Sequence, residues 1–420
     1  MTSEFRFFLK DKAALLWISI AFVSAVIAVS LGLNEVNQQR HSIAELTALD
    51  QIERDIALEG QSDWGSAGYY TYHLTYDPPS DFAFAAFGER DVSPWKHRIR
   101  LLALEGQIYE TDADNPDFAL IGRFDYAFVV TLLAPLLIIL LLYDLKSSER
   151  SAGRFNLIET SAGNGNRVWI SRSALRLGGL YIALLLPLWI GGLIEGTAVL
   201  TLIGASIAVG LYIVFWGVVA FIVAKAHRSG SANLTYLTGV WLGLCAILPA
   251  LLVLGVNTSV PLPDGSDIVL TQREAVNGAW DKPKDATMKP FVARYPELSD
   301  YAEIEKPFEW KWYFAFHQMG DQAAVPLSQS YRDGRLKRDK LTGSLSLISP
   351  ASFVQRQFEK LAKTDVTASF AYETRVRDFH EDLREWHYPR LFKETVFEVE
   401  SAKRELPVYA AVAEKSGEHR

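Results

Sequence analysis

The chain has 420 residues, 49% of them hydrophobic, and its formal net charge is −7. This acidic balance argues against a nucleic-acid partner, because a nucleic-acid surface requires clustered Lys and Arg. The single cysteine, Cys245, excludes an internal disulfide, and we interpret it as a small packing residue.

Apolar residues are gathered in five runs of about twenty residues, the length that an α-helix needs to cross a bilayer. Apart from Asp125, at the start of the second run, the runs contain no Asp, Glu, Lys, Arg or His. We therefore predict a mainly α-helical membrane protein with about five transmembrane helices. The runs are 13–33, 124–143, 177–194, 198–224 and 234–256. The first is longer than a signal peptide and continues in helix-favouring sequence, so we interpret it as an uncleaved anchor.

Basic residues near the ends of the runs set the expected orientation. They precede the first run, fill the loop between the second and third, and follow the fourth. If successive spans alternate in direction, these three segments lie on the same side of the membrane. Because such segments stay in the cytoplasm, we predict a cytoplasmic amino terminus and an extracytoplasmic carboxyl terminus. The predicted organisation is a tail and first helix at 1–33, an extracytoplasmic domain at 34–123, helices two to five at 124–256 with a cytoplasmic coupling loop at 144–172, and a second extracytoplasmic domain at 257–420.

The two extracytoplasmic segments are predicted to be α+β or mostly α-helical. A strand is expected at 69–76, and helices at 353–362 and 371–386. The aromatic cluster at 308–316 has three open interpretations: contact with the outer membrane surface, a lining for an amphipathic substrate, or a domain core.

Local features within these segments suggest structure more than chemistry. His380 and His387 share a helix face, but their spacing of seven is not the i, i+4 spacing of metal-binding helices. We expect a hydrogen-bonded structural helix there and no metal. In the runs, the small pairs Gly204/Ala208 and Gly239/Gly243 favour close helix packing, and Pro135, Pro187 and Pro249 are expected to distort their helices locally.

The chain carries no energy source that we can identify from its residues. The ionisable groups that an ion-coupled carrier places among its helices are missing from the runs. The glycine-rich stretch at 162–167 lacks the Gly-Lys-Ser/Thr ending that binds nucleotide phosphates, and we interpret it as a turn between helices. We therefore expect no cofactor and no enzymatic activity, and any energy must come from another chain.

Three stretches, Gly122 to Phe128, Ala134 to Leu137, and Tyr143 to Gly153, resemble type-2 ABC transporter permeases. Motifs at 273–277, 309–313, 349–350 and 364–389 are similar to a subgroup with large extracytoplasmic loops, in which two related permeases accompany one ATPase. The resemblance implies a bacterial inner-membrane location and, as partners, an ATP-binding cassette ATPase subunit and a second related permease or second copy. It also implies a coupling helix that seats in the ATPase, with Asp144, Ser147, Glu149, Arg150 and Gly153 as its site residues.

The chain departs from the family pattern at its carboxyl end. The family has a sixth span, whereas the apolar residues at 406–413 are too few to cross a bilayer and run into Glu414 and Lys415. A partner would have to supply a sixth helix, or it has been lost.

The predicted function is the permease subunit of an ABC-type exporter. One alternative is an ABC-type mechanotransmission or assembly factor that moves its outer domains without passing a substrate. A continuous cavity between the spans would count against that alternative, and a solidly packed bundle would favour it. Another is a membrane-anchored sensor or enzyme whose chemistry lies in 257–420.

Overall fold

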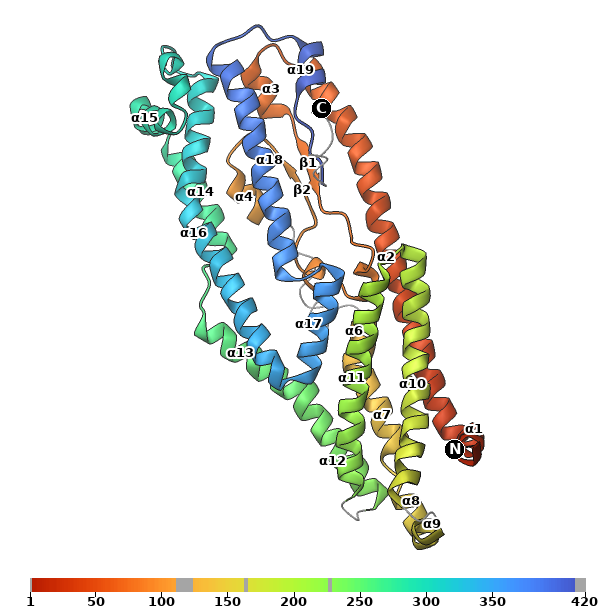
Figure 1. Ribbon diagram of the computed structural model, residues 1–420. Coiled ribbons are helices and arrows are strands. Elements are labelled where there is room, and N and C mark those ends of the chain that lie inside the picture. The colour runs from red at the N-terminus through yellow and green to blue at the C-terminus, as the bar shows by residue number, and fades with distance from the viewer. Residues whose placement is uncertain (1, 111–123, 162–164, 226–228, 412–420) are drawn as a thin grey trace.

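The computed structural model describes the whole chain except residues 1, 111–123, 162–164, 226–228 and 412–420. Its described residues form a long, mainly helical molecule with two parts stacked end to end (Figure 1). One part, which we call the bundle, holds five helical stretches that are long and apolar enough to cross a membrane. The other, which we call the head, contains a two-stranded sheet among helices. The mainly helical architecture with five candidate spans is as predicted.

The elements of the bundle follow the predicted apolar runs. They are α1 (Thr2–Lys10), α2 (Lys12–Glu59), α6 (Tyr126–Phe128), the π-helical stretch η3 (Val129–Leu133), α7 (Ala134–Leu142), α8 (Ser147–Ser151), α9 (Phe155–Ser161), α10 (Gly165–Glu195), α11 (Val199–Ala224), α12 (Gly230–Leu242), the π-helical stretch η4 (Gly243–Ile247) and α13 (Leu248–Ser259). The short helices α8 and α9 lie at the end of the bundle farthest from the head, which we call the basal end (Figure 1).

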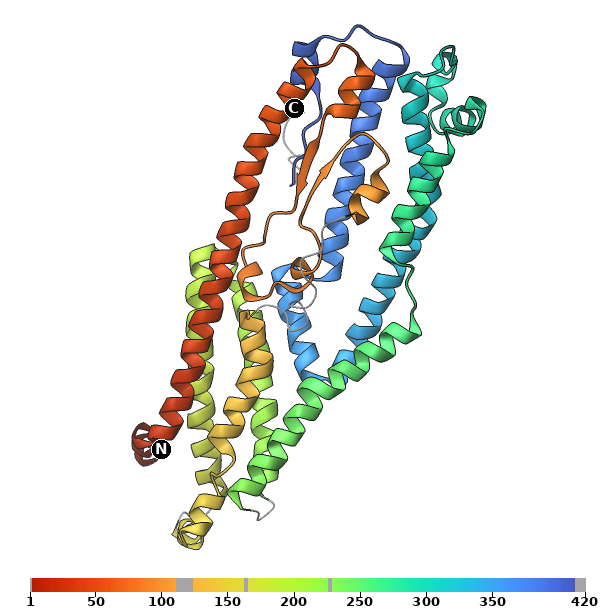
Figure 2. The ribbon, with the colours of Figure 1, turned by 180° about the vertical axis from the view of Figure 1, so that it is seen from behind.

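One helix, α2, belongs to both parts. Its 48 residues span about 72 Å at 1.5 Å per residue, more than twice the roughly 30 Å of a hydrocarbon core. Residues 13–33 are its apolar part, and the remainder rises along the head (Figure 2). At the junction, a Cβ on Gly32 would overlap the Phe84 carbonyl oxygen, so glycine lets η1 (Ala83–Ala85) pack directly on α2.

Two of the three proline positions show a local distortion. The π-helical stretches η3 and η4 directly precede the turns that contain Pro135 and Pro249. Helix α10 remains α-helical through Pro187. Extra residues in a helical turn are a common accommodation of proline in spanning helices.

The backbone acceptors around Pro135 are satisfied by neighbouring helices. Proline has no N–H, so the carbonyl of Thr131, four residues earlier, loses its helical donor. The Tyr212 hydroxyl on α11 donates to that carbonyl at 2.8 Å. The Trp241 indole on α12 donates to the adjacent Leu132 carbonyl at 3.2 Å. The proline thus ties three helices together where lipid offers no alternative donor.

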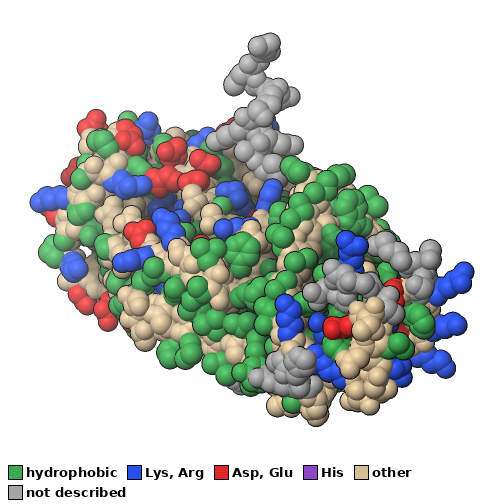
Figure 3. Space-filling view, turned by 60° about the horizontal axis from the view of Figure 1, so that its bottom comes forward, with side chains coloured by type: hydrophobic (Ala, Val, Ile, Leu, Met, Phe, Trp, Pro, Cys, Tyr) green, Lys and Arg blue, Asp and Glu red, His purple; other side chains and the backbone are tan. Residues whose placement is uncertain are grey.

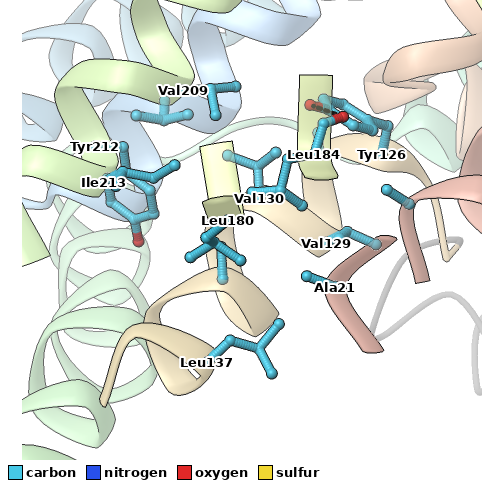
Figure 4. Packing of buried hydrophobic residues seen from close by; sticks show 14 of the residues in the cluster. Ala21, Tyr126, Val129, Val130, Leu137, Leu180, Leu184, Val209, Tyr212 and Ile213 are labelled. Carbon is cyan, nitrogen blue, oxygen red and sulfur yellow. Dashed lines mark hydrogen bonds between the residues drawn. The ribbon is translucent and has the colours of Figure 1, made fainter. Parts of the chain in front are cut away.

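Packed side chains fill the centre of the bundle. The residues labelled in Figure 4, drawn from α2, α6, η3, α7, α10 and α11, are Ala21, Tyr126, Val129, Val130, Leu137, Leu180, Leu184, Val209, Tyr212 and Ile213. The central stretch Tyr126–Ser151 is 67% buried over its most apolar window. The helices around this stretch are therefore closely packed.

The fifth stretch, Gly230–Ser259, is left almost uncovered. Only 11% of its most apolar window is buried, and it forms an oblique arm on the outside of the bundle (Figure 2). No described atom lies within 4 Å of a Cβ built on Gly239 or Gly243. By contrast, a Cβ built on Gly204 of α11 would lie 3.8 Å from the side chain of Leu361 in the head. The two small-residue pairs therefore have different neighbours.

The head is built from two segments of the chain. Its elements are α3 (Trp64–Tyr70), β1 (His73–Tyr76), η1, η2 (Gly88–Asp91), β2 (Lys96–Ile99), α4 (Leu104–Tyr109), α14 (Gly265–Gly278), α15 (Lys284–Arg294), η5 (Pro296–Tyr301), α16 (Trp310–Leu345), η6 (Ser346–Ile348), α17 (Pro350–Ala362), α18 (Val366–Phe392) and α19 (Val399–Glu405). Strands β1 and β2 are antiparallel. The strand expected at 69–76 begins only at His73, because α3 occupies its first two residues. The two expected helices lie within α17 and α18.

Both segments contribute to one hydrophobic core in the head. Leu58, Trp64 and Ile99 from the first segment pack in the same cluster as Phe291 and Phe316 from the second. The predicted division into 34–123 and 257–420 therefore describes chain order, whereas in space their described residues build a single head. Trp312, Phe314 and Phe316 are at most 4% exposed in this core. That placement supports the domain-core interpretation of the aromatic cluster and argues against the other two for these residues.

Buried ion pairs join the two segments of the head. Asp321 on α16 pairs with Arg384 on α18 and accepts hydrogen bonds from the backbone N–H of Leu104 at 2.6 Å and Glu105 at 3.0 Å. Arg377 on α18 donates to both carboxylate oxygens of Glu105, at 2.8 and 2.9 Å. Although burial opposes ionisation, these bonds hold the pKa of Glu105 below its usual value.

The two histidines singled out on α18 are structural. Nε2–H of His380 donates to the Arg100 carbonyl at 3.0 Å, and Nε2–H of His387 donates to the Trp64 carbonyl at 2.6 Å. Burial lowers the pKa of His387 to about 4 and that of His380 well below its usual value. Both rings therefore connect α18 to the first segment as neutral donors, which confirms the expected hydrogen-bonded helix.

Candidate functional site

The coupling residues predicted from the sequence lie at the basal end, on and around α8. The chain leaves α7 at Tyr143, makes a tight turn, and forms the five-residue helix α8. Gly153 ends this helix with a φ of +71°, a conformation that L side chains adopt with strain. The turn is closed by hydrogen bonds from the N–H of Gly153 to the Arg150 carbonyl and from the N–H of Arg154 to the Glu149 carbonyl, both at 3.0 Å. The glycine thus sets the angle between α8 and α9.

Glu149 is the centre of a charged clamp. Its carboxylate accepts from Arg154 Nε at 2.8 Å and from Arg172 Nη1 at 3.1 Å. Arg172, on α10, also donates to Glu4 of α1 at 2.8 Å. Glu149 and Arg172 therefore link four basal elements: α8, the turn after it, the long helix α10 and, through Glu4, the amino-terminal helix α1.

A second ion pair runs parallel to this clamp. Arg176, one turn along α10 from Arg172, pairs with Asp11 at 2.6 Å and donates to the carbonyl of Leu141 at the end of α7. Two successive turns of α10 are thereby fixed to α1, to the start of α2 and to the base of α7. Short, directional contacts therefore join the basal part of α10 to each of these elements.

The remaining predicted site residues are close to α8 but do not face one common point. Asp144 and Ser147 pack against the start of α12, where a Cβ on Gly230 would lie 3.5 Å from Asp144 Cβ and 3.3 Å from Ser147 Oγ. Arg150 lies instead over the Phe155 ring, with its guanidinium carbon 4.6 Å from the ring centre. The structure thus brings Glu149 and Gly153 into the clamp, and places Asp144 and Ser147 against a different helix.

The outward surface of this site is formed by α9 and the turn before it. Arg154 keeps 62% of its side chain exposed although it pairs with Glu149, and Leu157 is 68% exposed. An apolar side chain beside a basic one suits contact with a partner protein. The predicted turn at 162–167 lies partly outside the described residues, between α9 and α10.

The contacts that complete the clamp were not singled out by the sequence. Glu4 and Arg172 are 168 residues apart, and nothing local indicates their pairing. The available signal was the four-residue spacing of Arg172 and Arg176 on one face of a predicted helix. That spacing indicates a shared face but does not identify the acids that occupy it.

Two cavities stand out among the described residues: one lies at the tip of the head, and the other extends to the bundle, where Thr131, Cys245 and Pro249 line it. One, of about 770 Å³, is at the far tip between Trp64, Phe308 and Trp310. The other, of about 480 Å³, lies between α17 and the upper end of the bundle and is lined by Asp125 and Glu359. Burial raises the pKa of Glu359 to about 7. Within the part of the chain that the structure describes, no group of His, Cys, Asp and Glu is arranged to hold a metal ion.

Comparison with known proteins identifies only part of the head. Residues 268–410 match a family model described as a domain of unknown function, DUF3526. The match covers about a third of the chain and includes none of the basal end. No curated protein and no solved structure matches the chain.

Proposed function

We propose that the chain is the permease subunit of an ABC-type exporter in the bacterial inner membrane, driven by a separate ATP-binding cassette subunit. The observation that carries the proposal is the clamp around Glu149. It joins the short helix α8, which resembles a coupling helix, to the long helices of the bundle through Arg172 and Glu4. The ATPase would dock on α8 and α9 from the cytoplasm, and the head would lie outside the cell, as the basic residues at the span ends predict.

In this mechanism the chain is a lever and the ATPase supplies the force. Closure of the ATPase on ATP would push α8, and the rigid turn at Gly153 would carry that displacement to Arg172 and Arg176 of α10. Because these residues also hold α1 and α7, the displacement would tilt the bundle as a unit. The head would follow through α2, which is continuous between the two parts.

A second permease subunit would complete the transport path. The uncovered arm α12–η4–α13 offers an apolar face whose small residues Gly239 and Gly243 permit close approach of another helix. Such a partner, a related chain or a second copy, would place the path between subunits. A densely packed bundle within one subunit is compatible with that arrangement.

The mechanotransmission alternative is favoured by one specific observation. Helix α17 of the head is seated on the bundle, where Phe358 packs 5.6 Å from the Tyr126 ring and Leu361 covers Gly204. Motion of the bundle would therefore move the head directly, whether or not a substrate passes.

A disulfide between Gly204→Cys and Leu361→Cys, in a Cys245→Ala background, would lock this contact. Because this bond preserves the contact through which the motion would pass, a mechanotransmission factor should keep its function under oxidising conditions, and a loss of function on oxidation that reduction reverses would exclude transmission through this contact.

The proposal is tested by reconstitution with a candidate ATP-binding cassette subunit that co-purifies with this chain. The permease should stimulate ATP hydrolysis in proteoliposomes, and the double variant Glu149→Gln/Gly153→Ala should return the rate to that of the ATPase alone. The matched control is Gly278→Ala/Glu385→Gln in the head, where Gly278 has no close neighbour and Glu385 is exposed. Full stimulation by the clamp variant, or equal loss in the control, would remove the clamp from the mechanism.

A further inference from the structure

Three basic side chains at the basal end are not neutralised by a carboxylate among the described residues. Lys146, after α7, is only 5% exposed. Arg150 lies on α8, and Lys225 follows the last residue of α11. The ion pairs of this end are made by other arginines, such as Arg172. We call these three residues the basic triad.

Aromatic rings hold two members of the basic triad together. Lys146 Nζ is 4.6 Å from the centre of the Phe221 ring, and Lys225 Nζ is 5.3 Å from the same ring. Lys146 Nζ is also 5.7 Å from the Trp169 ring. Cation–π contacts of this kind position an ammonium group but do not cancel its charge.

The third member is connected through the same aromatic group. Arg150 lies over Phe155, which stacks on Trp169 with ring centres 5.6 Å apart. Nε and Nη1 of Arg150 are buried without a hydrogen-bond partner, as are Trp169 Nε1 and Ser147 Oγ. The site is therefore rich in donors and lacks an acceptor.

Glu159 does not supply that acceptor. Glu159 on α9 attracts Lys146 electrostatically, but the pair is not within ion-pair distance in the described structure, and Glu159 is exposed to solvent. Lys225 is also exposed, whereas Lys146 is buried and Arg150 is half-buried. Leaving these two cations without an anion is unfavourable, because desolvation is not offset by pairing. An anionic ligand with several acceptor oxygens would remove this cost.

We propose that the basic triad binds the phosphate of an anionic phospholipid from the cytoplasmic leaflet. The triad lies where α7, α10 and α11 end, which is the level of lipid headgroups if the apolar stretches occupy the hydrocarbon core. Lys and Arg side chains gather around this end of the molecule with few acids among them (Figure 3). Basic pockets between spanning helices on the cytoplasmic side recognise anionic headgroups in this way.

The position of the triad favours a lipid over acidic side chains of a soluble partner. Lys146 is enclosed between Phe221 and Trp169, which belong to the long helices α11 and α10. The surface open to a soluble protein is instead that of Arg154 and Leu157. The inference requires only that the bundle spans a membrane, and it stands or falls independently of the transport function proposed above.

The test measures lipid binding by the purified full-length chain in neutral detergent. Phosphatidylglycerol is titrated and bound lipid is counted by native mass spectrometry, with thermal unfolding as a second readout. The variant Lys146→Gln/Lys225→Gln should bind about 30-fold more weakly, since each basic side chain at a membrane surface contributes roughly fivefold. The control Lys12→Gln/Arg167→Gln removes two exposed charges from the same end and should bind nearly as well as the unaltered chain. Lys146→Arg, which keeps the charge, should retain binding.

Titrations with two further ligands show whether the bound phosphate belongs to a lipid or is a free anion. Phosphatidylcholine, which has no net charge, should not stabilise the chain, and inorganic phosphate at millimolar concentration should stabilise it far less than the lipid does. Equal stabilisation by inorganic phosphate would assign the site to a free anion and overturn the lipid assignment. If the control variant loses lipid affinity to the same extent, binding depends on general surface charge, and the proposed site would be overturned. Unchanged lipid binding together with lost ATPase binding in the triad variant would assign the triad to the partner protein.

Discussion

The bundle and the head bury their polar groups in opposite ways. In the bundle, side-chain donors such as Tyr212 satisfy backbone carbonyls freed by proline. In the head, full charges are buried as pairs, such as Asp321 with Arg384 and Glu105 with Arg377. The difference follows from the surroundings. Helices in lipid gain nothing by hiding apolar surface from each other and are joined by packing and hydrogen bonds. In the head, the ion pairs fix which pieces of chain meet.

The largest expected difference between the head and the bundle is in how their stability depends on pH. Five buried histidines of the head have lowered pKa values because of burial: about 3 for His73 and His317, about 4 for His97 and His387, and well below the usual value for His380. Below pH 6.5, the pKa of an unfolded histidine, the unfolded chain binds protons that the folded head does not. The head therefore becomes less stable as the pH is lowered. From pH 7.5 to 5.5 we expect a loss of about 1.4 kcal/mol for each histidine, about 7 kcal/mol in all.

Hydrogen exchange at the two pH values, corrected for intrinsic rates, measures this effect locally. Amides of α18 and β1 should lose protection, whereas those of α7 and α11, which contain no histidine, should keep it. Glu359, with its pKa raised to about 7 by burial, acts in the opposite sense because its neutral form is favoured in the folded state. Unchanged protection of α18 at pH 5.5 would contradict the description of these histidines as buried and neutral.

Removing one acid from the ion-pair network should be the most damaging single substitution in the head. Asp321→Ala leaves the buried Arg384 with only the more distant Glu381, at 3.6 Å, and removes the acceptor of two backbone N–H groups at the start of α4. We expect a loss of about 3–5 kcal/mol in the stability of the head, measured as faster exchange in α4 and α18. The control Asp378→Ala removes an exposed acid from α18 and should cost less than about 0.5 kcal/mol. A similar small loss in both variants would mean that charge pairing does not hold the two segments together.

A smaller effect is expected from the corresponding change in the bundle. Tyr212→Phe removes the donor to the Thr131 carbonyl and should cost about 1 kcal/mol, in the range measured for hydrogen bonds between spanning helices. Tyr143→Phe is the control, because no described atom bonds its hydroxyl. Thermal unfolding in detergent compares the two. If the control is equally destabilised, the proline-linked hydrogen bond has no special role.

The same contrast explains how far the sequence could predict the structure. Hydropathy located all five candidate spans, because a stretch of about twenty apolar residues is a local property. The prolines in the spans were also visible in the sequence. The sequence did not indicate that the Tyr212 hydroxyl, far along the chain, would donate a hydrogen bond to the Thr131 carbonyl. In the head, the helices at α17 and α18 were predictable from periodicity. The union of two segments into one core was not, because it depends on pairs such as Glu105 with Arg377 that lie 272 residues apart.

The candidate site was predictable to a similar extent. Its location between two spans, and the choice of Glu149 and Gly153 as candidate coupling residues, followed from the motif and its resemblance. The partner Glu4 did not, because a pair of residues 168 positions apart has no local sequence signature. Nor did the basic triad, since Lys146 and Lys225 meet only when α7 and α11 pack around Phe221.

The central claim is that a separate ATPase drives this chain by pressing on the basal end, and site-directed cross-linking tests it most directly. Cys245 is the only cysteine of the chain, so a Cys245→Ala background allows single positions to be probed in membranes that contain both subunits. Leu157→Cys at the basal end should cross-link to the ATPase, with a yield that changes on ATP binding, whereas Val396→Cys in the head should not. A Leu157→Cys chain that never cross-links to the ATPase, in a preparation where the two subunits are active together, would contradict the claim.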